Sequence, residues 1–252
     1  MDRMPQRRKV DFITARPIAH RGLHDISQGI VENTASAFAG AIDRGYAIEC
    51  DLQLTGDGDA VVFHDERLER LTHGRGMVKD LTAAEMKRLE IRQSKDHVQT
   101  LGEVLDQVKG KVPLIIELKS HWDGDERLAA RALAVLKGYA GPHCLMSFDP
   151  DIVAAVRRMS PQTIRGIVAE RAFDSYYDAL PLKTQMELRT FSHLNRTRPD
   201  FVSFHFGDLP WAPVTAMRAA GMPVITWTIR SAEEAWTALR FSDQITFEGF
   251  PA

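Results

Sequence analysis

Eight short apolar segments alternate with stretches of helical periodicity along this chain. The segments are rich in valine, isoleucine and phenylalanine, as buried parallel strands are. The expected strands are residues 17–20, 47–53, 113–119, 144–148, 164–169, 201–205, 223–229 and 244–247. A strand and a helix repeated about eight times predict parallel βαβ units. Because a (β/α)8 barrel commonly fills about 250 residues, we expect residues 1–252 to form one α/β domain, a (β/α)8 TIM barrel.

The expected helices lie between these strands. They span residues 34–44, 125–139 and 210–220, and two more begin at Asp149-Pro150 and at Ser231. These starts and stops carry helix-capping residues, such as Gly45 after the first helix. An open doubly wound sheet is the alternative architecture. The sequence has neither GxGxxG nor the Walker-type glycine loop that would favour it.

One stretch interrupts the alternation after the second expected strand. Asp57-Gly58 between two apolar runs predicts a hairpin. No helix fits before residues 60–63, so we expect them to lie in an elaborated loop. We assign residues 54–101 to a small insertion. It holds one expected helix, 82–89, opened by a Thr82/Glu85 capping box.

The charge balance limits the partners of the protein. There are 32 Lys+Arg and 34 Asp+Glu, a net charge of -2, so nucleic acid and anionic membranes are not expected partners.

The cysteines and the amino-terminal residues indicate the compartment. Cys50 and Cys144 lack metal-binding spacing and suit a reducing compartment. The basic residues among 1–12 precede no signal-like apolar stretch, and no run approaches the roughly 18 residues of a membrane span. We expect a cytoplasmic protein without integral membrane association, of unassigned oligomeric state.

Carboxylates follow the apolar cores of two expected strands. Glu49 and Asp51 are two residues apart, so they point to the same side of a strand, whereas Cys50 points away. Glu117 ends the next strand, and strand ends of this kind line the mouth of a barrel. Three converging carboxylates repel one another unless a cation or protons neutralise them. Oxygen ligands favour Mg²⁺ or Ca²⁺ over zinc.

Basic side chains and histidines occur at the same strand ends. Arg21 and Lys119 would suit a phosphoryl group beside a cation. His20 and His64 can transfer protons near neutral pH. Taken singly, each has a structural explanation, and Arg21 could simply pair with Glu49 or Glu32. Their joint occurrence at successive strand ends favours a phosphoryl-transfer site.

Other polar residues are expected to be structural. The run Asp65-Glu66-Arg67 is expected to be solvated surface, and His205 is a weaker candidate for a pocket wall. The remaining histidines are not assigned a function.

At the proposed site the sequence resembles the glycerophosphodiester phosphodiesterase family, within the phosphatidylinositol-specific phospholipase C-like barrels. The resemblance covers nearly the whole chain and is most specific in the first half. Its main motifs are Ala19-His20-Arg21-Gly22, Glu32-Asn33-Thr34, Glu49-Cys50-Asp51, Phe63-His64-Asp65, Thr100-Leu101, Glu117-Leu118-Lys119, Ser147-Phe148 and Thr226-Trp227-Thr228.

The resemblance implies a distorted barrel that hydrolyses small-molecule glycerophosphodiesters to glycerol 3-phosphate and an alcohol. It implies that His20 and His64 form the acid–base pair, and that the substrate 2-hydroxyl attacks first to give a cyclic phosphate. The other implied roles are one divalent cation, Mg²⁺ or Ca²⁺, on Glu49, Asp51 and Glu117; phosphate contacts from Arg21 and Lys119; and a pocket wall from Trp227.

Two segments depart from the family pattern. The last strand ends Thr246-Phe247-Glu248 where many members have Thr-Asp-x-Pro, and residues 173–198 lack a family signature. Neither departure is expected to involve the proposed catalytic residues.

The alternative functions are a lysophospholipase D or phospholipase C-type enzyme on the same barrel, an unrelated metal-dependent barrel hydrolase, and a barrel that binds phosphodiesters without turnover.

Overall fold

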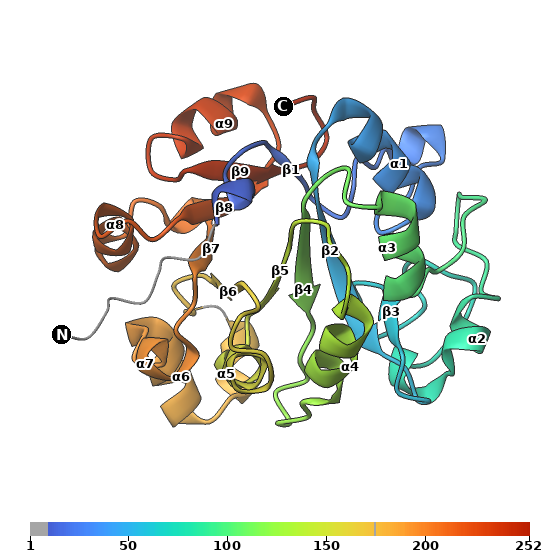
Figure 1. Cartoon of the computed structure of the whole chain (residues 1–252), viewed down its shortest axis with the longest axis horizontal. Helices are drawn as coiled ribbons and strands as arrows, with labels where there is room; N and C mark the ends of the chain where they lie inside the picture. Colours follow the sequence, from blue (N-terminus) through green and yellow to red (C-terminus); the bar gives the residue numbers. More distant parts are fainter. Residues whose placement is uncertain (1–9, 174) are drawn as a thin grey trace.

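A closed barrel of eight parallel strands forms the centre of the computed structural model, which describes residues 10–173 and 175–252 (Figure 1). The barrel closes because β1 pairs with both β2 and β9. The barrel strands are β1 (Ile18–Ala19), β2 (Ala47–Leu54), β4 (Leu114–Leu118), β5 (His143–Ser147), β6 (Arg165–Ala169), β7 (Phe201–His205), β8 (Val224–Ile229) and β9 (Gln244–Phe247). All eight predicted strands are present, and the predicted TIM barrel is confirmed.

Helices surround the strands on the outside (Figure 1). They are α1 (Ala35–Arg44), α3 (Leu101–Val108), α4 (Arg127–Leu136), α5 (Pro150–Met159), α6 (Leu182–Thr190), α7 (Leu194–Thr197), α8 (Ala212–Ala219) and α9 (Ala232–Ala238). The first helix illustrates why they form where they do. The Thr34 side chain accepts a hydrogen bond from the Ala37 N–H, and the helix stops at Gly45, whose φ is 70°.

The barrel interior toward the amino-terminal ends of the strands is filled by large apolar side chains. Phe201 is fully buried and its ring lies against Gly166, where a Cβ would come within 2.3 Å of the ring. Ile13, from the short helix η1 (Asp11–Ile13), joins the same buried cluster and covers the amino-terminal end of the barrel.

The predicted insertion after β2 begins with the expected hairpin. The strand β3 (Ala60–Val62) pairs antiparallel with the end of β2. It is followed by η3 (Val78–Asp80) and by α2 (Ala83–Met86), which is shorter than predicted but has the predicted capping box. These elements lie beside β2 (Figure 1). Together with Val31 they form an apolar cluster separate from the main core.

Three helices were not predicted. The helix α3 begins at Leu101 with a second capping box, from Thr100 and Glu103. The helices α6 and α7 lie in the segment without a family signature, and Leu182 on α6 is largely exposed. A helix whose apolar side chains face solvent lacks the periodic stripe that sequence analysis detects.

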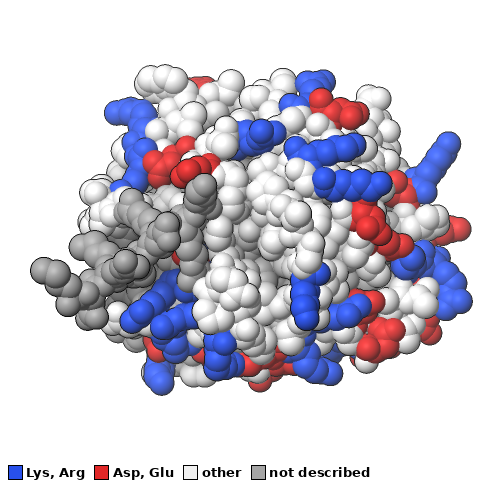
Figure 2. Space-filling model, in the orientation of Figure 1, with Lys and Arg blue, Asp and Glu red and all other residues white. Residues whose placement is uncertain are grey.

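The surface has no dominant charge on the face drawn in Figure 2, where basic and acidic side chains are interspersed. Among residues 10–173 and 175–252, no helix is long and apolar enough to cross a membrane. The basic amino-terminal residues 1–9 lie outside the described part of the chain.

Candidate active site

All eight predicted site residues line one cavity of about 280 Å³ at the carboxyl ends of the strands. They come from the ends of β1, β2, β4 and β8 and from the chain after β3. Their shared cavity follows from barrel topology, because parallel strands deliver their carboxyl ends to one rim. The residues are His20, Arg21, Glu49, Asp51, His64, Glu117, Lys119 and Trp227.

The three carboxylates meet at the bottom of this cavity. Asp51 on β2 pairs in register with Glu117 on β4, and Glu49 lies two residues before Asp51. An oxygen from each lies within 4.8 Å of the others, and all three side chains are buried. Cys50 faces the opposite way, into the apolar packing between β2 and the outer helices.

Burial and mutual repulsion perturb this cluster. Burial raises the pKa of Glu49 well above its usual range, and the charges of Asp51 and Glu117 raise it further. The pKa of Glu117 is also raised, mainly by burial. The pKa of Asp51 is lowered despite its burial, chiefly by the charge of Lys119. A compact all-oxygen set whose negative charges repel one another fits a divalent cation.

Two basic side chains partly neutralise the cluster. The Lys119 Nζ lies 2.8 Å from Asp51 and 2.6 Å from Glu117. The Arg21 Nε lies 3.3 Å from Asp51, but this buried N–H has no aligned acceptor among the described residues. Its backbone N–H donates to Glu49 at 2.9 Å. Arg21 therefore lines the cavity and retains a buried donor without a hydrogen-bond partner beside Asp51.

The turn that follows β1 explains how Arg21 reaches this position. Arg21 has a φ of 54° and Gly22 a φ of 82°. A Cβ at Gly22 would lie 2.9 Å from Ala37 on α1. Glycine is therefore required for this tight turn, which aims Arg21 into the barrel mouth.

Each histidine is held by a carboxylate. The His20 Nδ1 lies 2.6 Å from Glu248 Oε2, and the His64 Nδ1 lies 2.7 Å from Asp65 Oδ1. An ionised carboxylate can only accept, so each Nδ1 carries a proton and each Nε2 is available to exchange one. Burial lowers the pKa of both histidines, and nearby Arg21 lowers both further.

These contacts correct two expectations from the sequence. Glu248 lies where the last strand departs from the family pattern, and it contacts a proposed catalytic residue after all. Asp65 is not simply solvated, because it accepts from Arg70 as well as from His64. Hydrogen bonds from these partners lower the pKa of both carboxyl groups and keep them ionised.

Further supporting residues were present in the motifs but were not predicted as site residues. The Asn33 side-chain amide donates to Asp51 at 2.8 Å. Glu32 binds Arg21 at 2.7 Å and also accepts two hydrogen bonds from Arg70. The Glu32-Asn33 pair therefore holds two neighbouring residues of the cavity, Arg21 and Asp51.

An aromatic wall closes another side of the cavity. Trp227 donates from Nε1 to the Ser203 carbonyl at 3.2 Å and meets Phe148 edge-to-face at 5.5 Å. His205 packs against Trp227 but does not line the cavity itself. It lies instead beside Glu170 and Asp208.

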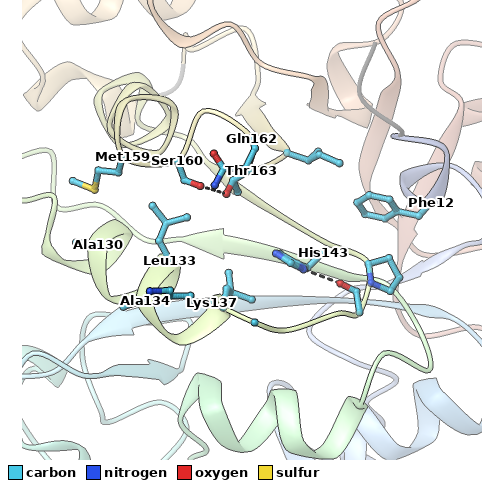
Figure 3. A pocket seen from close by; sticks show the side chains of 15 residues that line it. Phe12, Ala130, Leu133, Ala134, Lys137, His143, Met159, Ser160, Gln162 and Thr163 are labelled. Carbon is cyan, nitrogen blue, oxygen red and sulfur yellow. Dashed lines mark hydrogen bonds between the residues drawn. The ribbon is translucent and has the colours of Figure 1, made fainter. Parts of the chain in front are cut away.

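A larger cavity of about 830 Å³ lies away from this site (Figure 3). It is bordered by α4, α5 and Phe12, and none of the predicted site residues lines it. Two of the polar groups labelled there bond locally: Thr163 donates to Ser160, and the His143 Nδ1 lies 2.8 Å from the Gly141 carbonyl. The chemistry therefore concentrates in the smaller cavity.

Comparison with known proteins decides the family. Residues 20–243 match the model of the glycerophosphoryl diester phosphodiesterase family. The chain belongs to that family. A glycerophosphodiester phosphodiesterase from Caldanaerobacter subterraneus is 30% identical over an alignment of 227 residues that covers 86% of each chain. The predicted resemblance and enzyme class are thereby confirmed.

Solved phosphodiesterase structures have the same architecture. An Oleispira antarctica phosphodiesterase in complex with the product sn-glycerol-3-phosphate is 26% identical, with a TM-score of 0.77 over 94% of this chain and 93% of that one. A Silicibacter pomeroyi protein described as a glycerophosphoryl diester phosphodiesterase, 24% identical, shares the fold with a TM-score of 0.73 over 92% and 89% of the two chains.

Proposed function

We propose that this member of the phosphodiesterase family hydrolyses glycerophosphodiesters to glycerol 3-phosphate and an alcohol. One observation carries the proposal: two histidines, two basic side chains and three carboxylates surround a single small cavity. The Oleispira relative, which holds sn-glycerol-3-phosphate, supports the same substrate class. The barrel, with the 54–101 insertion, is proposed to act as one domain.

In each step of the proposed reaction, one histidine acts as base and the other as acid. The His20 Nε2 removes the proton from the substrate 2-hydroxyl, whose oxygen attacks phosphorus, while the His64 Nε2 protonates the leaving alcohol. The P–O bond to the alcohol breaks and a cyclic phosphate forms. Water then opens the ring with the roles reversed, so the net reaction consumes one water and restores both histidines.

The surrounding charges stabilise the phosphoryl oxygens. Arg21 contacts these oxygens through its guanidinium, and Lys119 through the ammonium that is paired with Asp51 and Glu117 in this structure. A divalent cation bound by Glu49, Asp51 and Glu117 would polarise the phosphoryl group and make the hydroxyl more acidic. Mg²⁺ and Ca²⁺ both suit these ligands.

Glu248 and Asp65 are proposed to position the histidines. Each binds Nδ1, which fixes the tautomer and turns Nε2 toward the substrate. Each also stabilises the imidazolium that forms when its histidine takes up a proton. Trp227 and Phe148 exclude water from one side of the cavity.

A coupled assay for glycerol 3-phosphate tests the proposed function. The substrates are a panel of glycerophosphodiesters and one lysophospholipid, each assayed after chelation and with Mg²⁺ or Ca²⁺ restored. Release of glycerol 3-phosphate from the diesters supports the proposal. Turnover of the lysophospholipid alone supports a lysophospholipase D, and binding without turnover on any metal supports a non-catalytic barrel.

A further inference from the structure

A second cavity, of about 510 Å³, adjoins the candidate active site. The two cavities share His64, Glu117, Lys119 and Phe148 as lining residues. The shared residues include the proposed acid, His64, which would protonate the leaving alcohol. The second cavity therefore lies where the alcohol of a bound diester would extend.

Aromatic side chains form one wall of this second cavity. The Trp122 Nε1 lies 3.3 Å from the Tyr176 hydroxyl, and Tyr176 meets Tyr177 edge-to-face at 5.3 Å. Tyr177 is itself buried in a small apolar cluster with Leu188. Trp122 and Tyr176 are thus held by neighbours and present ring surface to the cavity.

The charge around the second cavity is mainly negative. Glu66 and Glu170 line it, and Glu66 lies 3.0 Å from His121. Arg67 also lines it and is paired with Glu69 at 2.7 Å. Lys119, at the boundary with the first cavity, is paired with two carboxylates of its own. The carboxylates of Glu66 and Glu170 are therefore the charges best placed to meet a bound group.

Aromatic faces combined with carboxylates bind organic cations. A ring face attracts a cation through its quadrupole, and quaternary ammonium groups, which cannot donate hydrogen bonds, are typical ligands of aromatic sites. A polyol would find few hydrogen-bonding partners on the rings, and an anion would meet the two glutamates. The lining chemistry therefore discriminates between classes of alcohol.

We propose that this second cavity is the leaving-group subsite and that it selects a cationic alcohol, a quaternary ammonium alcohol above all. The inference rests on the proposed function, since the alcohol must leave from the adjoining site. Trp122 and Tyr176 hold the cation by cation–π contact, and Glu66 and Glu170 supply the opposing charge.

The test compares kcat/KM for glycerophosphocholine and glycerophosphoglycerol. The wild type is expected to prefer the choline ester by about tenfold. Trp122→Leu is expected to remove most of that preference, because it lowers kcat/KM for the choline ester more than for the glycerol ester. Tyr176→Leu, at a largely exposed side chain, and Glu66→Gln are expected to reduce the preference in the same direction. Trp236→Leu and Glu233→Gln on α9 are the matched controls.

The outcomes separate this inference from the proposed function. Equal kcat/KM for both esters, or an equal loss for both in Trp122→Leu and Tyr176→Leu, would overturn the subsite. Failure of the wild type to hydrolyse either ester would overturn the proposed function. In that case calorimetric titration with tetramethylammonium decides the subsite. Saturable binding that Tyr176→Leu weakens supports it, and no binding by the wild type refutes it.

Discussion

Replacing Glu248 by glutamine tests how the last strand contributes to catalysis. The substitution keeps the shape of the side chain and a neutral acceptor for the His20 Nδ1–H, now 2.6 Å from Glu248 Oε2. It removes the charge that would stabilise His20 once that residue has taken up a proton. A hydrogen bond to a charged group contributes about 1.5–3 kcal/mol and a neutral one about 0.5–1.5 kcal/mol. The difference of about 1–1.5 kcal/mol corresponds to a loss of about tenfold in kcat.

The pH profile of the same variant distinguishes positioning from simple structural damage. The hydrogen bond to Glu248 raises the pKa of His20, so its weakening lowers that pKa. A base must be unprotonated to act, so the acidic limb of kcat/KM should move to lower pH if His20 is the base. If His20 is the acid, the alkaline limb should move down instead.

The assay is glycerol 3-phosphate release measured across pH, with Glu233→Gln on the exposed start of α9 as a matched carboxylate-to-amide control. A kcat within twofold of wild type together with two unmoved limbs would refute the reasoning.

The same geometry gives four further predictions. Chelation of divalent cations should lower kcat by at least about 10²-fold, with recovery on Mg²⁺ or Ca²⁺. Glu49→Gln should abolish that recovery, yet the chelated variant should unfold at the same or a higher temperature than the chelated wild type, because a buried, mutually repelling carboxylate is gone; a lower unfolding temperature contradicts this. Gly166→Ala places a Cβ 2.3 Å from the Phe201 ring; such overpacking costs about 1–3 kcal/mol and should lower Tm by roughly 2–10 °C. An unchanged Tm in thermal denaturation would show that the ring moves freely. Because burial lowers the pKa of both histidines, the acidic limb of kcat/KM should lie below the usual histidine value of about 6.5; a limb above it contradicts the assignment.

The barrel and the residues at its mouth were predictable because both depend on local patterns. Apolar runs mark buried strands, and the two-residue spacing of Glu49 and Asp51 sends both to one side of β2. Parallel strands then bring Glu117 beside them without any further information. The hairpin at Asp57-Gly58 was likewise readable from its turn residues.

Contacts between distant segments could not be predicted in this way. Glu248 reaches His20 across 228 residues, and only the closure of β9 onto β1 brings them together. No local pattern marks the contact. The departure of the last strand from the family's Thr-Asp-x-Pro pattern gave no indication of it either. The same holds for Arg70, which bridges Glu32 and Asp65 from within the insertion.

The missed helices have two different causes. The Thr100/Glu103 capping box before α3 carries the same signal as Thr82/Glu85, but it was assigned to the end of the insertion. By contrast, α6 buries only Gln185 and Leu188 and leaves Leu182 exposed, so its sequence lacks an apolar stripe. The start of α3 was therefore predictable from its capping residues, whereas α6 depends on tertiary context.

The central claim is that His20 and His64 form the acid–base pair of this cavity. Its most direct test is kcat for glycerophosphodiester hydrolysis by His20→Ala and His64→Ala, with the exposed His73→Ala as the control. Each site variant is expected to lose about 10²–10⁴-fold in kcat and one limb of the pH profile, with the control unchanged. Residual activity in the tens of per cent in both site variants would contradict the claim.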